Sequence, residues 1–71
     1  MKIGDLVQFT NVTSVYTKWF YSHIGVVEKV RINSSGLAFC SVKWLQPVKY
    51  FRKHTSTSSL KQSHFTIITK E

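Results

Sequence analysis

Apolar and polar residues alternate along most of the chain, which predicts β-strands rather than helices. In the segment "LAFCSVKWL", Ala38, Cys40, Val42 and Trp44 are expected to share one apolar face. Turn-forming clusters such as "NSSG" separate the alternating segments. The strands predicted in this way span residues 5–10, 24–32, 37–45, 48–54 and 64–68. The polar tract "TSTSS" at 55–59 is predicted as a loop, and residues 60–62 as one helical turn.

Five short strands, a long first loop at 11–23 and a helical turn before the last strand predict an all-β fold, the small, partly open SH3-like barrel. A sheet that closes on itself hides its strand edges, which suits a chain of 71 residues. A five-stranded oligonucleotide-binding barrel is the competing fold, but it usually needs a longer chain and an additional helix. We expect a single domain over residues 1–71.

Three adjacent aromatic residues occur in "KWFYSHIGVV", within the predicted first loop. Neighbouring side chains of an extended chain point to opposite faces, so these rings are expected to alternate. Phe20 has no polar atom and is the least costly ring to bury, whereas Trp19 and Tyr21 each keep a donor. We therefore expect Phe20 in the core, with Trp19 and Tyr21 facing a partner near Lys43.

The second predicted strand follows directly after these rings. Ile24, Val26 and Val30 are expected to hold it against the core. Gly25 is isolated from other glycines and lies where the strand leaves the loop, so we expect it to permit close packing.

Composition indicates a small cytoplasmic protein. The start of the chain has no apolar run of the length found in signal peptides, and no stretch approaches the roughly 20 apolar residues of a membrane span. Cys40 is the only cysteine, which suits a reducing compartment, and its place on an apolar face predicts burial. The sequons at Asn11 and Asn33 are then interpreted as turn residues.

The net charge is +7, and no acidic residue lies between Glu28 and Glu71. Such a one-signed surface raises the rate of encounter with acidic partners and costs some stability through self-repulsion. A structural explanation also exists, because lysines keep small β proteins soluble and protect sheet edges from pairing. The charge therefore favours an acidic partner without naming it.

The inventory of reactive side chains argues against an enzyme. Asp5, Glu28 and Glu71 are the only side-chain carboxylates, and none lies close in sequence to a histidine that it could orient. His54 and His64 lack companion ligands for a metal, and no glycine belongs to a phosphate-binding motif. We expect no catalytic residue, metal, cofactor or small-molecule substrate.

Aromatic and basic residues therefore form the candidate binding surface. An acidic protein could use both, because aromatic residues and Arg commonly anchor interfaces. Nucleic acid could use both as well, with phosphates on the cations and bases stacked on the rings. The candidate partner-binding residues are Tyr16, Trp19, Tyr21, Lys43, Lys49, Arg52 and Lys53.

The segments "GDLV", "YSHIGVVEKV", "SVKWLQPVKY" and "LKQSHFTII" together resemble the photosystem I subunit IV family of SH3-like barrels. The resemblance spans nearly the whole chain. Small SH3-like proteins of tailed phages, including phages of cyanobacteria, and the nucleic-acid-binding KOW segment share the Gly-Asp-x-Val start and the Ile-Gly-Val-Val step. A cyanophage-type protein of the host cytoplasm is therefore a related expectation.

In the photosystem family, a basic residue before the aromatic that closes the third strand helps to dock the acidic electron carrier ferredoxin. The resemblance places Lys43, before Trp44, at that position. The subunit has no catalytic chemistry, so the resemblance implies an accessory subunit or docking module. Here the first loop is longer, an extra residue enters near Pro47, and Ser and Thr replace the Asn-Asn-Phe-Ala signature of the last loop. These departures favour a divergent, phage-encoded relative, for which a structural or assembly role is a further alternative.

Overall fold

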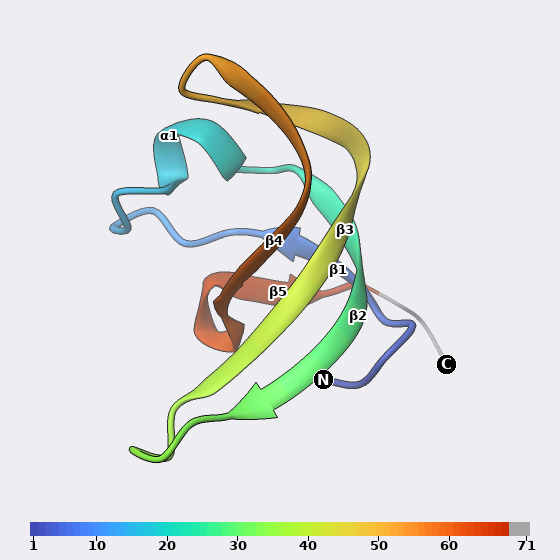
Figure 1. Ribbon diagram of the computed structural model, residues 1–71, viewed down its shortest axis with the longest axis vertical. Coiled ribbons are helices and arrows are strands. Elements are labelled where there is room, and N and C mark those ends of the chain that lie inside the picture. Colours follow the sequence, from blue (N-terminus) through green and yellow to red (C-terminus); the bar gives the residue numbers. More distant parts are fainter. Residues whose placement is uncertain (69–71) are drawn as a thin grey trace.

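The structure is a computed structural model that describes residues 1–68 of the chain. Strands make up most of it, with a short helix in the first loop and a 3₁₀ turn before the last strand (Figure 1). The predicted order of strands, long first loop and final helical turn is confirmed, although the turn lies slightly later than residues 60–62. The elements are β1 (Leu6–Phe9), α1 (Thr17–Phe20), β2 (Ile24–Ile32), β3 (Ala38–Tyr50), β4 (Lys53–Lys61), η1 (Gln62–His64) and β5 (Phe65–Ile67).

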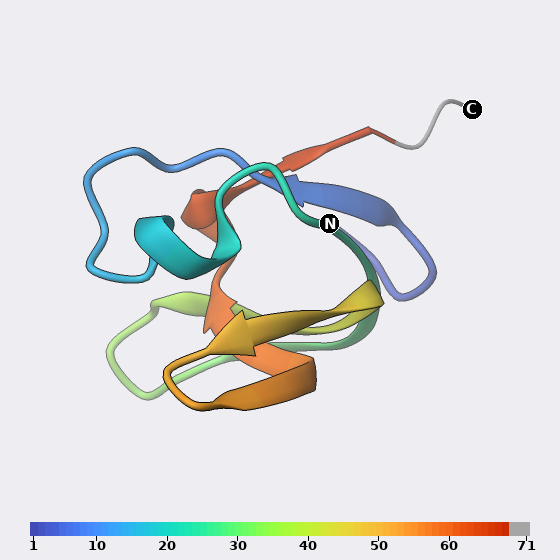
Figure 2. The ribbon, with the colours of Figure 1, turned by 90° about the horizontal axis from the view of Figure 1, so that it is seen from above.

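All five strands belong to one antiparallel sheet with the order β4-β3-β2-β1-β5. Seen from above, β1 and β5 form one layer and β3 and β4 the other, while β2 curves from the first to the second (Figure 2). The sheet thus folds over its own apolar face and encloses the core between its two halves. This is the small, partly open SH3-like barrel that the sequence predicts.

The core is a single cluster of apolar side chains between the two layers. Phe9 lies fully buried, with its ring centroid 5.5 Å from that of Phe65 in an edge-to-face arrangement. On β3, Cys40, Val42 and Trp44 are buried and the residues between them are more exposed, so the predicted face of this strand is confirmed. The buried apolar residues are Val7, Phe9, Phe20, Val27, Cys40, Val42, Trp44, Val48, Leu60 and Phe65.

The predicted end of the third strand is wrong. β3 continues past Pro47 to Tyr50, and the "TSTSS" tract at 55–59 lies inside β4 instead of forming a loop. Proline cannot donate to the ladder, and the pairing of β3 with β4 is interrupted between Lys43 and Val48, so the strand passes through Pro47 in an irregular stretch. β4 is at the edge of the sheet, where exposed Ser and Thr residues remove the apolar alternation that marks a strand.

The predicted core face of the second strand is also wrong. Val27 is buried, whereas Ile24 and Val26 are only half-buried. Glu28 is an extra residue that has no partner on β3, because the register shifts between Val27 and Lys29. Beyond this bulge Val30 pairs with the inward-facing Cys40, but it lies at the end of the barrel and is 40% exposed.

Two predicted backbone features are confirmed. At the turn between β2 and β3, Asn33 Oδ1 accepts hydrogen bonds from the backbone N–H groups of Ser35 and Leu37, at 2.9 and 3.0 Å. Gly36 completes this turn with a φ of +82°, a conformation that glycine adopts without steric cost. Gly25 faces the interior, where a Cβ atom would lie only 3.0 Å from the backbone oxygen of Lys43.

Candidate binding surface

Four aromatic residues meet where α1 packs against the hairpin that joins β3 to β4. We call Tyr16, Trp19, Tyr50 and Phe51 the aromatic cluster. The Trp19 ring centroid lies 4.7 Å from that of Tyr50 and 4.6 Å from that of Phe51. Tyr50 and Phe51 are themselves 4.5 Å apart at an angle of 62°. Such tilted, edge-to-face contacts are the favoured geometry of aromatic pairs, so these rings support one another.

Phe20 connects the aromatic cluster to the core. Its ring stacks on Trp44 at 5.2 Å and on Tyr50 at 5.4 Å, and Tyr16 contacts it at 6.3 Å. Phe20 is 2% exposed, which confirms its predicted inward position. The aromatic cluster is therefore an outward continuation of the packed interior and not a loose surface patch.

Hydrogen bonds within the first loop fix the position of α1. Asn11 Oδ1 accepts from the backbone N–H groups of Thr13 and Ser14, at 2.8 and 2.7 Å, as expected for a turn residue. The Thr17 hydroxyl donates to the backbone oxygen of Asn11 at 2.9 Å, which ties the start of the helix to the start of the loop. The loop thereby holds Trp19 against the hairpin.

Phe51 occupies the tip of the β3–β4 hairpin in a strained conformation. Because Tyr50 pairs with Lys53, the turn consists of Phe51 and Arg52 alone. The φ of Phe51 is +56°, in the left-handed region where turns of this length usually place Gly, Asn or Asp. Its side chain is nevertheless 63% exposed. The hairpin thus displays a large apolar ring at a position that favours a small residue.

Positive charge surrounds this ring. Lys49, Arg52 and Lys53 are all exposed on the hairpin. Lys18 lies over Trp19, with its Nζ atom 4.3 Å from the ring centroid, in a cation–π contact. Residues 50–55 also line a shallow hollow beside the tip.

The structure divides the residues predicted to bind a partner into two groups. Tyr16 and Trp19 lie in the aromatic cluster, with Lys49, Arg52 and Lys53 beside it. Tyr21 follows α1 and is 50% exposed. Lys43 lies elsewhere, on the outward side of β3, where it pairs with Val26 and Thr57.

Part of the predicted ring geometry needs correction. Trp19 and Phe20 lie in a helix and not in an extended segment, so alternation does not apply to them. Trp19 is half-buried against the hairpin and does not share the exposure of Tyr21. Sequence reasoning missed Tyr50 and Phe51 because it placed both in the middle of a strand. Their adjacency to a run of cations was the available signal.

The remaining titratable side chains are dispersed. Within residues 1–68 no three His, Cys, Asp or Glu side chains gather closely enough to hold a metal ion. Asp5 is buried and accepts a hydrogen bond from the backbone N–H of Lys2 at 2.9 Å. The His64 ring packs on Phe9 with Nδ1 buried and unpaired, and burial together with the nearby charge of Lys61 lowers the pKa of His64.

Cys40 is 1% exposed, and burial raises the pKa of its thiol. We expect a thiol reagent to modify it at least about a thousandfold more slowly in native protein than in denaturant, because reaction requires opening of the barrel. Reaction with a chromogenic disulfide, followed with and without urea, measures this ratio. Rapid labelling of native protein would contradict the inward orientation of Cys40.

Comparison with known proteins yields no relative. No protein family model, no curated protein and no solved structure matches this chain. In the described part of the chain, no helix is long and apolar enough to cross a membrane. Functional inference therefore depends on the residues and their geometry.

Proposed function

We propose that this protein is a non-enzymatic binding module that docks onto an acidic protein surface through the aromatic cluster and the surrounding cations. The observation that carries the proposal is Phe51 at the hairpin tip, whose backbone is strained and whose ring is exposed. Strained backbone in a folded protein persists where the surrounding structure imposes it, and it is concentrated at functional sites.

The energetics of Phe51 favour a binding role over a structural one. A non-glycine residue in the left-handed region costs about 1–2 kcal/mol. Burial could offset this cost, but the side chain remains 63% exposed. Aromatic residues that project from a rigid support are typical anchors of protein interfaces, where one residue can contribute 2 kcal/mol or more. Trp19 and Tyr50 provide that support.

The charge of the hairpin selects the kind of partner. Lys49, Arg52 and Lys53 surround the ring on a chain whose net charge is +7. Cations at the rim of an interface accelerate association with acidic surfaces and make it sensitive to salt. The resemblance to the photosystem I subunit IV family suggests an acidic ferredoxin as a defined probe, although Lys43, the residue that the resemblance places at the docking position, lies outside the aromatic cluster. A phage-encoded protein would meet such a carrier in the host cytoplasm.

The docking proposal is tested by titrating an acidic ferredoxin with wild-type protein and with Phe51→Gly at low ionic strength. We expect salt-sensitive binding by the wild type and a loss of about 30-fold in Phe51→Gly, the size of an interface anchor. Leu37→Ala is the control, because it removes an exposed apolar side chain from the turn between β2 and β3, at the other end of β3 from the hairpin, and it should bind normally. Undetectable binding by the wild type would argue against an acidic partner of this kind, and normal binding by Phe51→Gly would remove the hairpin from the interface.

The same position provides a stability prediction. Phe51→Ala removes the ring but keeps a Cβ atom in the left-handed region, whereas Phe51→Gly removes both. We expect Phe51→Gly to be more stable than Phe51→Ala, with a free energy of unfolding about 1 kcal/mol higher, because glycine relieves the strain. Urea denaturation of the two variants measures the difference. A less stable Phe51→Gly would show that the backbone at the tip is not strained.

A further inference from the structure

The three central strands present a second basic surface on the outside of the barrel. Since Cys40, Val42 and Trp44 point inward, the alternate residues of β3 point outward. Their cross-strand partners on β2 and β4 share this side of the sheet. We call the resulting set the outer face, and its rows are Arg31–Phe39–Lys61, Lys29–Ser41–Ser59 and Val26–Lys43–Thr57.

The composition of the outer face is unusual for a surface that only needs to be soluble. Its nine positions hold four cations, three hydroxyl side chains, one aromatic ring and one valine, and the only acidic residue of the three strands is the exposed Glu28, at the bulge beside Lys29. Same-face neighbours along a strand are about 6.6–6.8 Å apart, and adjacent strands about 4.8 Å. Like charges at this density repel one another and destabilise the fold, so the arrangement favours an anionic ligand.

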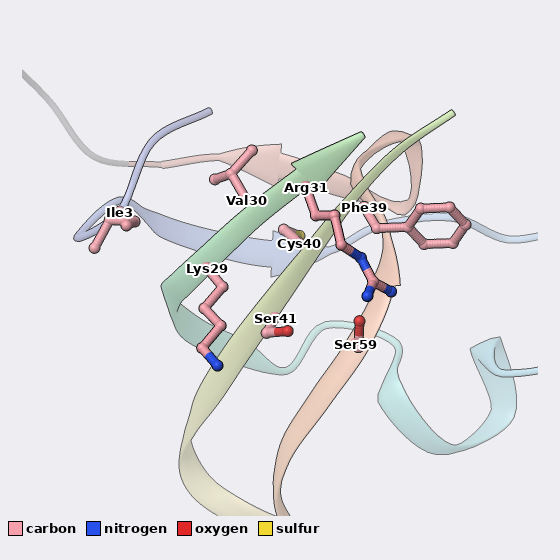
Figure 3. Close-up of a pocket in the computed structure, with 8 residues that line it drawn as sticks. All are labelled: Ile3, Lys29, Val30, Arg31, Phe39, Cys40, Ser41 and Ser59. Carbon is pink, nitrogen blue, oxygen red and sulfur yellow. The ribbon is translucent and has the colours of Figure 1, made fainter. Parts of the chain in front are cut away.

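A hollow of about 560 Å³ lies at one edge of the outer face, where it is lined by outer-face residues and by the apolar Ile3, Val30 and Cys40 (Figure 3). The Arg31 side chain extends from β2 across β3 toward Ser59 on β4, and Lys29 lies to the other side of Ser41 (Figure 3). The Arg31 guanidinium thus lies beside Ser59 and the Lys29 ammonium lies on the far side of Ser41, so two cations and two hydroxyl groups line the same shallow hollow (Figure 3). These are the side chains that contact phosphate oxygens in nucleic-acid complexes.

We propose that the outer face binds the sugar–phosphate backbone of single-stranded nucleic acid. Arg31, Lys29 and Lys43 would follow successive phosphates. Phe39, half-buried between Arg31 and Lys61, offers a ring on which an unpaired base can stack. Because the proposed contacts are with phosphates and with the flat face of a base, and not with base edges, binding is expected to be independent of sequence.

This inference does not depend on the docking of a protein at the hairpin. The outer face includes Lys43, which the structure separates from the aromatic cluster, and it includes no residue of that cluster. The two surfaces can therefore be disabled separately, and each provides the control for the other.

The test is the salt dependence of binding to a fluorescent oligothymidine of about 16 nucleotides, which is long enough for a single small domain. If the four cations neutralise phosphates, log K should fall against log salt with a slope of about −3. Arg31→Gln combined with Lys43→Gln should reduce the slope by about 1.4 and weaken binding. Arg52→Gln combined with Lys53→Gln removes the same charge from the hairpin and should leave the slope unchanged.

Phe39→Leu separates stacking from charge. This variant should weaken oligothymidine binding by roughly 5- to 150-fold while keeping the wild-type slope, since each stacked base contributes that much. Thermal melting of every variant verifies that the barrel is intact. The proposal would be overturned if the wild type did not bind oligothymidine at low salt. It would also be overturned if the outer-face and hairpin double variants lost the same amount of affinity. Tighter binding to a duplex of the same length would also overturn it. So would outer-face variants that weaken ferredoxin binding and leave oligothymidine binding unchanged.

Discussion

Phe20→Ala is expected to lower the free energy of unfolding by about 3–5 kcal/mol. The Phe20 ring is 2% exposed and lies at the centre of a stack between Trp44 at 5.2 Å and Tyr50 at 5.4 Å, with Phe9 at 6.1 Å. Removal of the ring leaves a cavity between α1 and β3. The paired β3 strand cannot move far enough to fill this cavity. Because small domains are stable by only about 5–15 kcal/mol, much of the total would be lost.

Urea denaturation of the wild type and the variant measures this change. Tyr21→Ala is the matched control, because the adjacent ring is 50% exposed and should change stability by less than about 0.5 kcal/mol. Phe20→Leu should lose less than Phe20→Ala, since it fills part of the cavity. Similar stabilities for Phe20→Ala and Tyr21→Ala would place Phe20 outside the core.

Side-chain chemistry predicted the burial of Phe20, although the predicted backbone geometry was wrong. An apolar ring without a polar atom is the least costly aromatic to bury whether the chain is extended or helical. The helix itself is four residues long and has no side-chain cap, so no helical signal precedes it. It exists because Phe20 packs into the barrel and because Thr17 and Asn11 close the loop.

Tyr50 and Phe51 were missed as binding residues because Pro47 was interpreted as the end of the third strand. Proline usually ends a strand, and ending it there placed Tyr50 and Phe51 in the middle of the next one. In the structure the strand passes Pro47 in an irregular stretch and the hairpin turns at Phe51. A turn of two residues without Gly, Asn or Asp lacks the local signal by which hairpins are recognised.

The outer face became visible only with the register of the strands. The sequence shows that Lys29, Lys43 and Lys61 are basic, but their spacing along the chain does not place them on one side of the sheet. The bulge at Glu28 reverses the alternation of β2, so Lys29 and Arg31 face outward while Val26 does the same before the bulge. Alternation along a strand cannot reveal such an insertion.

Gly25 lies where β2 approaches β3 so closely that a side chain would be crowded. An added Cβ atom would lie 3.0 Å from the backbone oxygen of Lys43 and 3.3 Å from both Trp44 Cε3 and Val42 Cβ. The first contact is with the backbone of the paired strand, which can move only by distorting the β2–β3 ladder. Trp44 cannot yield either, because its Nε1 donates to Ser58 Oγ at 3.0 Å and its ring stacks on Phe20.

Gly25→Ala should therefore lower the free energy of unfolding by about 2–3 kcal/mol, at the upper end of the cost of overpacking a core. Gly36 provides the contrast, since its φ is +82° but nothing lies within 4 Å of an added Cβ. Gly36→Asn should be well tolerated, because asparagine adopts the left-handed conformation more readily than other residues with a side chain. Urea denaturation of both variants separates steric overlap from backbone conformation. Gly25 has close neighbours in a backbone conformation open to any residue, whereas Gly36 has a positive φ and no close neighbour. A stable Gly25→Ala together with an unstable Gly36→Asn would mean that the β2–β3 contact is looser than the 3.0 Å approach implies.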